Sequence, residues 1–304
     1  MANKFRGLVA ATHTPFDSQG ELKLSAVPAQ AERLVRDGVA AVFIGGTTGE
    51  CSSLTTEERI LLGRRWAEVA RGGPLQVVVH VGSNSLSESK ALAVQAQESG
   101  AAAIAALSPS YFKPRDLDAL VAWCTEVAGA APALPFYFYD IPSMTGVQLS
   151  MPEFLERAPS KVPTLAGLKF TNLDVVTLQE CLAAGGGRFD VLWGVDEALL
   201  AALALGVEGA VGSSYNFAAP LYHRVIAAFQ AGDLTKARVE QLRAVRLVKL
   251  LSGFGYMAAA KAVMGFIGVD VGPPRLPNVR LTPEQVARLN AGLDRLGFLD
   301  TIRG

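Results

Sequence analysis

Short apolar runs typical of buried β-strands recur along the chain, and each is followed by a segment of helical character. This alternation restricts the fold to an α/β architecture in which helices cover a parallel sheet. Eight repeats predict a (β/α)8 TIM barrel; an open doubly wound sheet is the alternative, because element order alone does not distinguish a closed sheet from an open one. The predicted strands are Gly7–Thr12, Ala41–Ile44, Leu75–Val81, Ala102–Leu107, Leu134–Tyr139, Leu165–Phe170, Asp190–Trp193 and Gly209–Gly212. The predicted barrel helices are Ala26–Asp37, Glu57–Arg71, Leu86–Ser99, Leu117–Ala128, Pro152–Ala158, Val175–Ala184, Ala198–Leu205 and Leu221–Ala231.

The chain is longer than such a barrel needs. A barrel of this kind takes roughly 250 residues, whereas the chain has 304. We assign residues 1–232 to the barrel and its active site, and residues 233–304 to a C-terminal three-helix extension packed on the barrel. The extension helices are expected at Leu234–Leu251, at Ala258–Ile267 and from Thr282, where Thr282-Pro-Glu-Gln285 predicts a capping box.

Composition limits the partners and the compartment. The chain has 28 basic and 28 acidic side chains, so no surplus of positive charge indicates nucleic acid or an acidic membrane surface, and we expect a small-molecule partner. Three widely spaced cysteines, Cys51, Cys124 and Cys181, favour free thiols and a cytoplasmic location. We expect neither a signal segment nor a membrane span, because the longest apolar runs are too short.

Lys169 stands in Leu165–Thr171, a run that otherwise predicts a buried strand. Burial disfavours a charged ammonium group and can lower a lysine pKa from about 10.4 toward roughly 7–8, where the neutral amine attacks carbonyl carbon. Lys169 is therefore a candidate for an imine-forming (Schiff-base) lysine. The alternative is a lysine at a strand end whose head reaches solvent. Thr171 lies on the same face of the strand, since side chains alternate with period two.

A glycine-rich turn, Gly45-Gly-Thr-Thr-Gly-Glu50, follows the second strand and precedes a predicted helix start at Thr55. Backbone N–H groups in such a turn bind carboxylate or phosphate. It lacks the Gly-Lys-Ser/Thr ending of a P-loop and the spacing of a dinucleotide fingerprint. A plain tight βα turn is the alternative interpretation.

Further polar side chains follow other strands at the edge where a TIM barrel builds its active site. Tyr139 ends the fifth strand and can move protons, whereas packing is the better interpretation for Tyr137. The carboxylates of Asp196 and Glu197 follow the seventh strand, where complementing a helix dipole is the more common role. Ser213 follows the eighth strand and either faces the site or caps the next helix. The three histidines, His13, His80 and His223, lack metal-ligand spacing and are interpreted as structural.

Three of these motifs together resemble those of the dihydrodipicolinate synthase/N-acetylneuraminate lyase family of class I aldolases, and the resemblance covers nearly the whole chain. Gly45–Glu50 resembles the family's pyruvate-carboxylate turn, Tyr139-Asp-Ile-Pro142 its catalytic tyrosine segment and Gly167-Leu-Lys169 its Schiff-base strand. The Asp196-Glu197 pair resembles the corresponding pair in the lyase branch of the family. The segment Ser143–Val147 lacks the arginine that the synthase branch would carry.

The resemblance implies a carbon–carbon lyase that reversibly cleaves N-acetylneuraminate to pyruvate and N-acetylmannosamine through a lysine imine, without metal or other cofactor. It implies that Lys169 and Tyr139 are catalytic and that Thr47 and Thr48 hold the pyruvyl carboxylate. A family tyrosine that reaches a neighbouring subunit corresponds to Tyr111, which implies a homotetramer. The residues implied to contact the sugar hydroxyls are Thr171, Gly194, Asp196, Glu197 and Ser213.

Two alternatives to this function stay open at the level of sequence. Another pyruvate-dependent aldolase or dehydratase, or the synthase itself, could use the same imine with a different second substrate. A barrel that senses pyruvate or a sugar acid without catalysis is the more remote alternative, because a fold does not fix a function.

Overall fold

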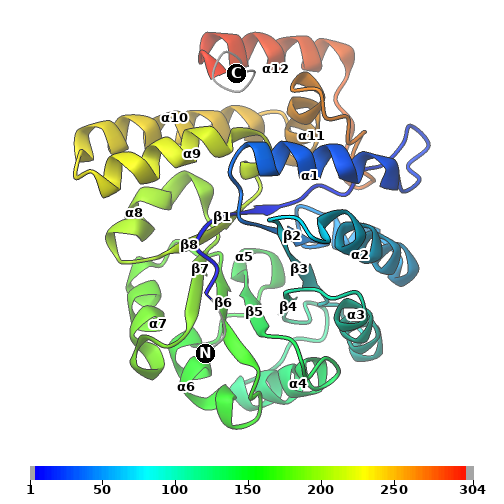
Figure 1. Cartoon of the computed structure of the whole chain (residues 1–304), viewed down its shortest axis with the longest axis vertical. Helices are drawn as coiled ribbons and strands as arrows, with labels where there is room; N and C mark the ends of the chain where they lie inside the picture. The colour runs from blue at the N-terminus through cyan, green and yellow to red at the C-terminus, as the bar shows by residue number, and fades with distance from the viewer. Residues whose placement is uncertain (1–3, 299–304) are drawn as a thin grey trace.

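The computed structural model describes residues 4–298 and contains eight parallel strands that close into a barrel in the order β1 to β8 (Figure 1). Strand β8 pairs with β1 through Gly7–Gly209 and its neighbours, which closes the sheet. The predicted TIM barrel is confirmed, and the open doubly wound alternative is wrong. The strands are β1 (Gly7–Ala11), β2 (Ala41–Ile44), β3 (Gln76–His80), β4 (Ala103–Leu107), β5 (Phe136–Asp140), β6 (Leu165–Phe170), β7 (Asp190–Trp193) and β8 (Gly209–Gly212).

Helices surround the barrel and continue beyond it. The barrel helices are α1 (Val27–Arg36), α2 (Thr56–Ala70), α3 (Leu86–Glu98), α4 (Leu117–Gly129), α5 (Pro142–Thr145), α6 (Met151–Arg157), α7 (Val175–Gly187), α8 (Leu199–Ala204) and α9 (Tyr215–Gln230). The 3-10 helices are η1 (Leu24–Ala26), η2 (Cys51–Ser53), η3 (Ala158–Ser160) and η4 (Asp196–Ala198). The C-terminal helices are α10 (Leu234–Ser252), α11 (Tyr256–Phe266) and α12 (Pro283–Arg295).

Local capping residues set several helix starts. The Thr55 side chain accepts a hydrogen bond from the Glu58 N–H, and the Glu58 carboxylate accepts one from the Thr55 N–H, so α2 begins with a complete capping box. Thr282 and Gln285 form the second box, at the start of α12. At α6 the Ser150 side chain accepts a hydrogen bond from the Glu153 N–H. The predicted starts of these helices follow from satisfying the first free N–H groups.

Two apolar layers position the site. Alternate strand residues point outward against the helices, as Leu168 and Phe170 do on β6. The other set fills the barrel interior and includes Phe43, Tyr137 and Tyr139. The Tyr137 hydroxyl donates to Asp190 Oδ2 at 2.8 Å, which supports its interpretation as a packing residue.

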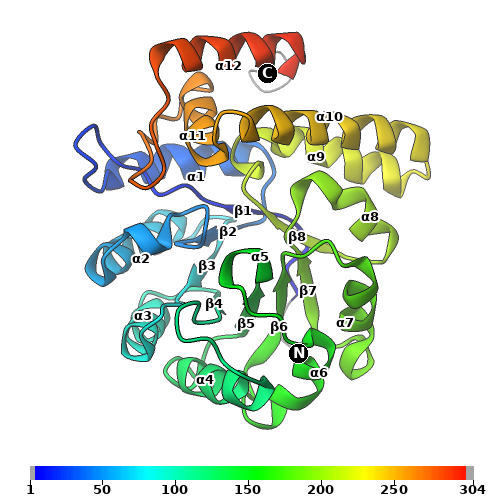
Figure 2. The same cartoon turned by 180° about the vertical axis from the view of Figure 1, so that it is seen from behind.

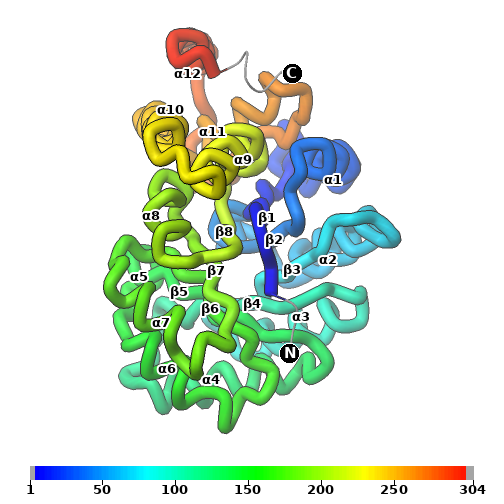
Figure 3. Tube along the Cα trace, turned by 60° about the vertical axis from the view of Figure 1, so that its left-hand side comes forward, coloured from blue at the N-terminus to red at the C-terminus, as the bar shows by residue number. Residues whose placement is uncertain are grey.

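The C-terminal extension packs on the barrel side that carries α9 and α1. Helix α10 lies along α9, and α12 lies at the end of the molecule opposite α4 and α6 (Figure 1, Figure 2 and Figure 3). Leu247 and Leu251 of α10 belong to the same apolar cluster as the outer barrel core. The division of the chain into a barrel (residues 1–232) and an extension (residues 233–304) stays a prediction. Residues 1–3 of the first part and 299–304 of the second lie outside the described residues.

In residues 4–298, no helix taken singly has both the length and the apolar character needed to cross a membrane; α10 and α11 meet that test only as a pair, bent by 111°.

Two helices differ from prediction. Helix α9 begins at Tyr215, whereas the sequence predicts a start at Leu221, directly after Pro220. Proline is common in the first turn of a helix and rare in its interior, but here Pro220 lies inside the helix. Its first turns are kept helical by burial of residues such as Tyr215 and Phe217, which outweighs the hydrogen bond lost at proline. The one-turn helix α5 was not predicted, because Pro142–Thr145 is too short to carry a periodic pattern.

The close approach of β6 and β7 depends on Gly167. A methyl group there would lie 1.8 Å from the carbonyl oxygen of Asp190, so Gly167→Ala should force the strands apart and lower the free energy of unfolding by about 1–3 kcal/mol or more. Denaturant unfolding measures this. The control is Gly129→Ala at the end of α4, where no atom lies within 4 Å and stability should stay equal or rise. Equal midpoints for Gly167→Ala and wild type would contradict the packing argument.

Candidate active site

Strand β6 places Lys169 inside the barrel, where the residue is only 4% exposed. Its backbone is in register with Tyr139 on β5 and Leu192 on β7. The Nζ atom lies 4.1 Å from the ring centroid of Phe43 and 4.0 Å from that of Tyr139. Two aromatic faces favour a cation, but burial dominates and lowers the pKa of Lys169 to about 7, against the opposing effect of Asp196. A substantial fraction of this amine is therefore neutral near pH 7.

The end of β5 places the Tyr139 hydroxyl next to the glycine-rich turn. Tyr139 Oη lies 3.3 Å from Thr47 Oγ1. The tyrosine ring packs edge-on against Phe43, with centroids 5.6 Å apart. Burial raises the pKa of Tyr139 to about 12, although the Thr47 and Thr171 hydroxyls act to lower it. The phenol is thus protonated and can donate a proton.

The turn Gly45–Glu50, which we call the anion turn, is closed by its own backbone. The Glu50 N–H donates to Thr47 O at 3.0 Å, and the Cys51 N–H donates to Gly46 O at 3.2 Å. Gly45 has a φ of +63°, and a Cβ atom at Gly49 would lie 3.0 Å from the Gly45 backbone. Thr47 and Thr48 are half-buried at its apex. The helix start predicted at Thr55 is confirmed, because Thr55 is the N-cap of α2; the 3-10 helix η2 lies between the turn and that residue.

His80 and Arg59 support this turn, and sequence reasoning did not find that role. His80 Nε2 accepts from the Leu107 N–H, so Nδ1 carries the proton and donates to Gly45 O at 2.8 Å. Burial and the Arg59 charge hold the pKa of His80 well below its usual range, which keeps the ring neutral. Arg59 itself donates to the carbonyl oxygens of His80 and Gly82. The position of His80 at the end of an apolar strand, where site residues of a barrel lie, is the sequence signal that could have indicated this role.

On the other side of Lys169, the ends of β6 and β7 meet at Thr171 and Gly194. The Gly194 N–H donates to Phe170 O at 2.8 Å. A Cβ atom at Gly194 would lie 2.0 Å from Thr171 Oγ1, so only glycine fits this approach. A cleft of about 770 Å³ opens beside this point; its lining includes Thr171, Val195 and Ser143 but not Lys169.

The adjacent carboxylates of Asp196 and Glu197 have different surroundings. Asp196 is buried, and its Oδ2 accepts hydrogen bonds from the N–H and the hydroxyl of Ser214, which ties η4 to the start of α9. Burial raises the pKa of Asp196 to about 6, with the Ser214 hydrogen bonds opposing it. Glu197 is half-buried beside it. Asp196 therefore has a structural role at least, and Glu197 is the more accessible carboxylate.

Ser213 reaches a residue of the C-terminal extension. Its Oγ lies 2.7 Å from the hydroxyl oxygen of Tyr256, the first residue of α11. The sequence offered no signal for this contact, because 43 residues separate the two positions.

Tyr111 is not brought to Lys169 by the fold of one chain. It lies on the loop after β4, is 79% exposed and packs edge-on against Phe112, which is also exposed. Its N–H donates to Asn84 Oδ1. Whether it serves a neighbouring subunit stays a prediction.

All three cysteines are free thiols, as the sequence predicts, and Cys51 beside the anion turn is half-buried. Across residues 4–298, no three His, Cys, Asp or Glu side chains are arranged to hold a metal ion.

Comparisons with known proteins agree with this geometry. The family model described as the dihydrodipicolinate synthetase family matches residues 4–296. The chain is 41% identical to a Mus musculus protein named N-acetylneuraminate lyase over 98% of this chain and 94% of that protein. Among solved structures, the Proteus mirabilis N-acetylneuraminate lyase superposes with a TM-score of 0.95 at 37% identity, covering 97% of this chain and 100% of that chain. A Bacillus anthracis dihydrodipicolinate synthase superposes with a TM-score of 0.89 at 30% identity, covering 97% and 99%.

The fold and the site define a (β/α)8-barrel protein with a buried lysine in its mouth. The chain belongs to the dihydrodipicolinate synthetase family, and the predicted family resemblance is confirmed.

The lowered pKa of Lys169 predicts an unusual pH dependence. Its rate of acylation by acetic anhydride should rise about tenfold per pH unit up to pH 7 and level off above it, because only the neutral amine reacts. Ordinary exposed lysines should keep gaining reactivity toward pH 10. Competitive labelling followed by peptide mass spectrometry gives both curves from one experiment. A Lys169 curve that follows the exposed lysines would contradict the assigned pKa.

Proposed function

We propose that the protein is a carbon–carbon lyase that reversibly cleaves N-acetylneuraminate to pyruvate and N-acetylmannosamine. One observation carries the proposal: Lys169 is buried, its pKa is lowered to about 7, and it faces a protonated tyrosine beside an anion turn. Such an arrangement suits imine formation with a 2-keto acid. Relatives named N-acetylneuraminate lyase at about 40% identity over nearly the whole chain support the choice of substrate.

In the first step, neutral Lys169 Nζ attacks the C2 ketone of the open-chain sugar acid. The carbinolamine loses water as Tyr139 delivers a proton to the departing oxygen, which leaves a cationic iminium. Thr47 and Thr48 hold the carboxylate through hydroxyl and backbone donors, so the keto carbon is oriented toward the amine.

In the second step, the C3–C4 bond breaks and its electron pair moves toward the iminium. The C4 hydroxyl loses its proton and becomes the aldehyde of N-acetylmannosamine. Tyr139 receives this proton as the phenolate left by the first step; the adjacent iminium charge stabilises that phenolate, because Lys169 Nζ lies 4.0 Å from the tyrosine ring. Tyr139, protonated again, then donates its proton to C3 of the enamine. Water hydrolyses the resulting iminium, which releases pyruvate and the Lys169 amine and returns a proton to Tyr139.

The remaining roles are part of the same proposal. Thr171, Gly194, Asp196, Glu197 and Ser213 contact the sugar hydroxyls, and Asp196 also orders η4 through its bonds to Ser214. Lys169 and Tyr139 carry the chemistry without a metal or other cofactor. The protein works in the cytoplasm as a homotetramer, in which the exposed Tyr111 reaches the site of a neighbouring subunit.

Product analysis tests the proposed function. Incubation with N-acetylneuraminate should release pyruvate and N-acetylmannosamine in equal amounts. Pyruvate with borohydride should leave a reduced adduct on Lys169, while Lys169→Met should remove both outcomes. An adduct on Lys113 or Lys261 would overturn the imine assignment. Labelling of Lys169 without cleavage of the sugar acid would instead favour another pyruvate-dependent enzyme of this family.

Glu197 should set the choice of substrate. Hydrogen bonds to a charged group contribute roughly 1.5–3 kcal/mol, so Glu197→Ala should lower kcat/KM for N-acetylneuraminate by about 10–150-fold. A shortened keto acid that lacks the distal hydroxyls should lose much less. If Glu197 only complements a helix dipole, both substrates should be affected equally and the melting temperature should fall. Kinetics on both substrates, with thermal melts of the same variant, separate the two roles.

A further inference from the structure

Two residues of the C-terminal extension hold the carboxylate of Glu50, the last residue of the anion turn. Lys261 of α11 places Nζ 2.7 Å from Glu50 Oε1, and both side chains are only 1% exposed. The backbone N–H of Arg275, in the connector before α12, donates to Glu50 Oε2 at 2.9 Å. Both oxygens of this buried carboxylate are therefore bound from outside the barrel sequence.

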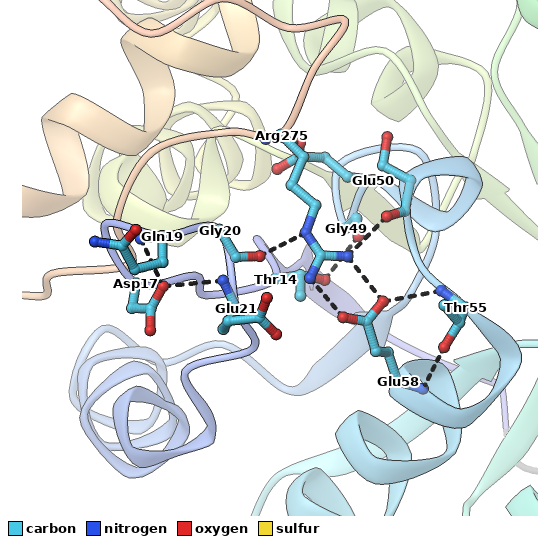
Figure 4. A network of polar contacts seen from close by, with 11 residues as sticks. Thr14, Asp17, Gln19, Gly20, Glu21, Gly49, Glu50, Thr55, Glu58 and Arg275 are labelled. Carbon is cyan, nitrogen blue, oxygen red and sulfur yellow. Dashed lines mark hydrogen bonds and ion pairs between the residues drawn. The ribbon is translucent and has the colours of Figure 1, made fainter.

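Lys261 also completes a ring of contacts through Thr14. Its Nζ donates to Thr14 O at 2.8 Å and to Pro273 O at 3.1 Å. The Thr14 hydroxyl donates to Gly49 O at 2.7 Å, as Figure 4 shows. The last two residues of the anion turn are thus fixed by one connected network.

The Arg275 side chain holds the segment that follows the turn. It donates to Ser53 O at 2.8 Å and to both carboxylate oxygens of Glu58, and it donates to Gly20 O at 2.7 Å (Figure 4). The bonds to Arg275 hold the pKa of Glu58 below its usual value. The chain from the anion turn to the start of α2 is therefore clamped by the extension.

The conformation at Glu50 needs such support. Within residues 4–298, Glu50 is the one non-glycine residue with a positive φ, at +55°. A side chain in this region is strained and persists where its surroundings enforce it. The same residue donates its N–H to Thr47 O, so its conformation is linked directly to the residue proposed to hold the carboxylate.

We infer that Lys261 and Glu50 are positioning residues for the keto-acid carboxylate. Their buried ion pair fixes the anion turn so that its donors at Thr47 and Thr48 point at the carboxylate, and the extension is in this sense part of the substrate site. The inference rests on the proposed function. Neither residue touches substrate, so its loss acts on capture of the carboxylate rather than on the reacting amine.

The test uses a double variant, because a single substitution would leave a buried charge unpaired and could prevent folding. Glu50→Gln/Lys261→Met removes both charges together. The readout is borohydride-dependent labelling of Lys169, measured against pyruvate concentration and, separately, with acetone, which has the ketone but no carboxylate. The half-saturating pyruvate concentration should rise about tenfold or more, while the acetone labelling rate should stay within about twofold of wild type.

The matched control is Glu240→Gln. Glu240 of α10 is also buried and is ion-paired to Arg224 of α9 at 3.0 Å and to Arg243 at 2.9 Å, so it joins the extension to the barrel at a different place. Both arginines reach solvent, so this single substitution leaves no buried charge unpaired. Its pyruvate curve should match wild type. If the double variant fails to fold, Thr14→Val, which removes only the hydrogen bond to Gly49 O, should raise the half-saturating pyruvate concentration by about threefold or more.

Each outcome decides the inference. An unchanged pyruvate curve in the folded double variant, or in Thr14→Val where that variant replaces it, overturns it. Equal losses with pyruvate and acetone also overturn it, because they indicate general disorder around Lys169. A wild-type protein whose Lys169 is not labelled by pyruvate at all would overturn the proposed function itself, which keeps the two failures distinct.

Discussion

The structure depends on one unfavourable burial. Lys169 stands inside the barrel with its amine between the rings of Phe43 and Tyr139, and removal from water lowers its pKa to about 7. The closed sheet makes this possible, because neighbouring strands on both sides cover the amine and leave it little solvent. The same burial that gives a reactive amine opposes folding, because Lys169 is protonated more readily in the unfolded chain than in the folded one. This penalty grows as the pH falls from 10.5 to about 7 and stays constant below, and burial of the surrounding apolar core has to outweigh it.

The groups that face Lys169 are held by contacts distributed over the whole chain. His80, itself held by Arg59, fixes Gly45 at the start of the anion turn, and Lys261 fixes Glu50 at its end. On the opposite side, Asp196 holds Ser214. A buried polar group needs a partner, so each of these contacts both satisfies a buried atom and orders a loop. The barrel supplies strand ends, while distant residues decide the shape of the loops between them.

Much of the fold could be predicted because many of its elements depend on residues that are neighbours in the sequence. Apolar runs predict the eight strands, and capping boxes at Thr55 and Thr282 predict the starts of α2 and α12, since such signals need only neighbouring residues. The sequence predicts too late a start for α9, because burial of Tyr215 and Phe217 keeps the residues before Pro220 helical. Closure of the sheet through β1 and β8 depends on pairing between the two ends of the barrel sequence, which no local pattern encodes.

The reactive groups can be identified from the amino-acid sequence: a lysine in an apolar strand, a tyrosine at the end of another strand and a glycine-rich turn are each recognised from period-two alternation and turn composition. How these groups are held depends on long-range contacts. Ser213 lies against Tyr256, Glu50 pairs with Lys261, Asp196 is buried against Ser214, and Tyr111 is exposed. Hydrogen bonds and ion pairs between residues far apart in sequence have no period or spacing, so they form only when the closed barrel and its extension bring the partners together.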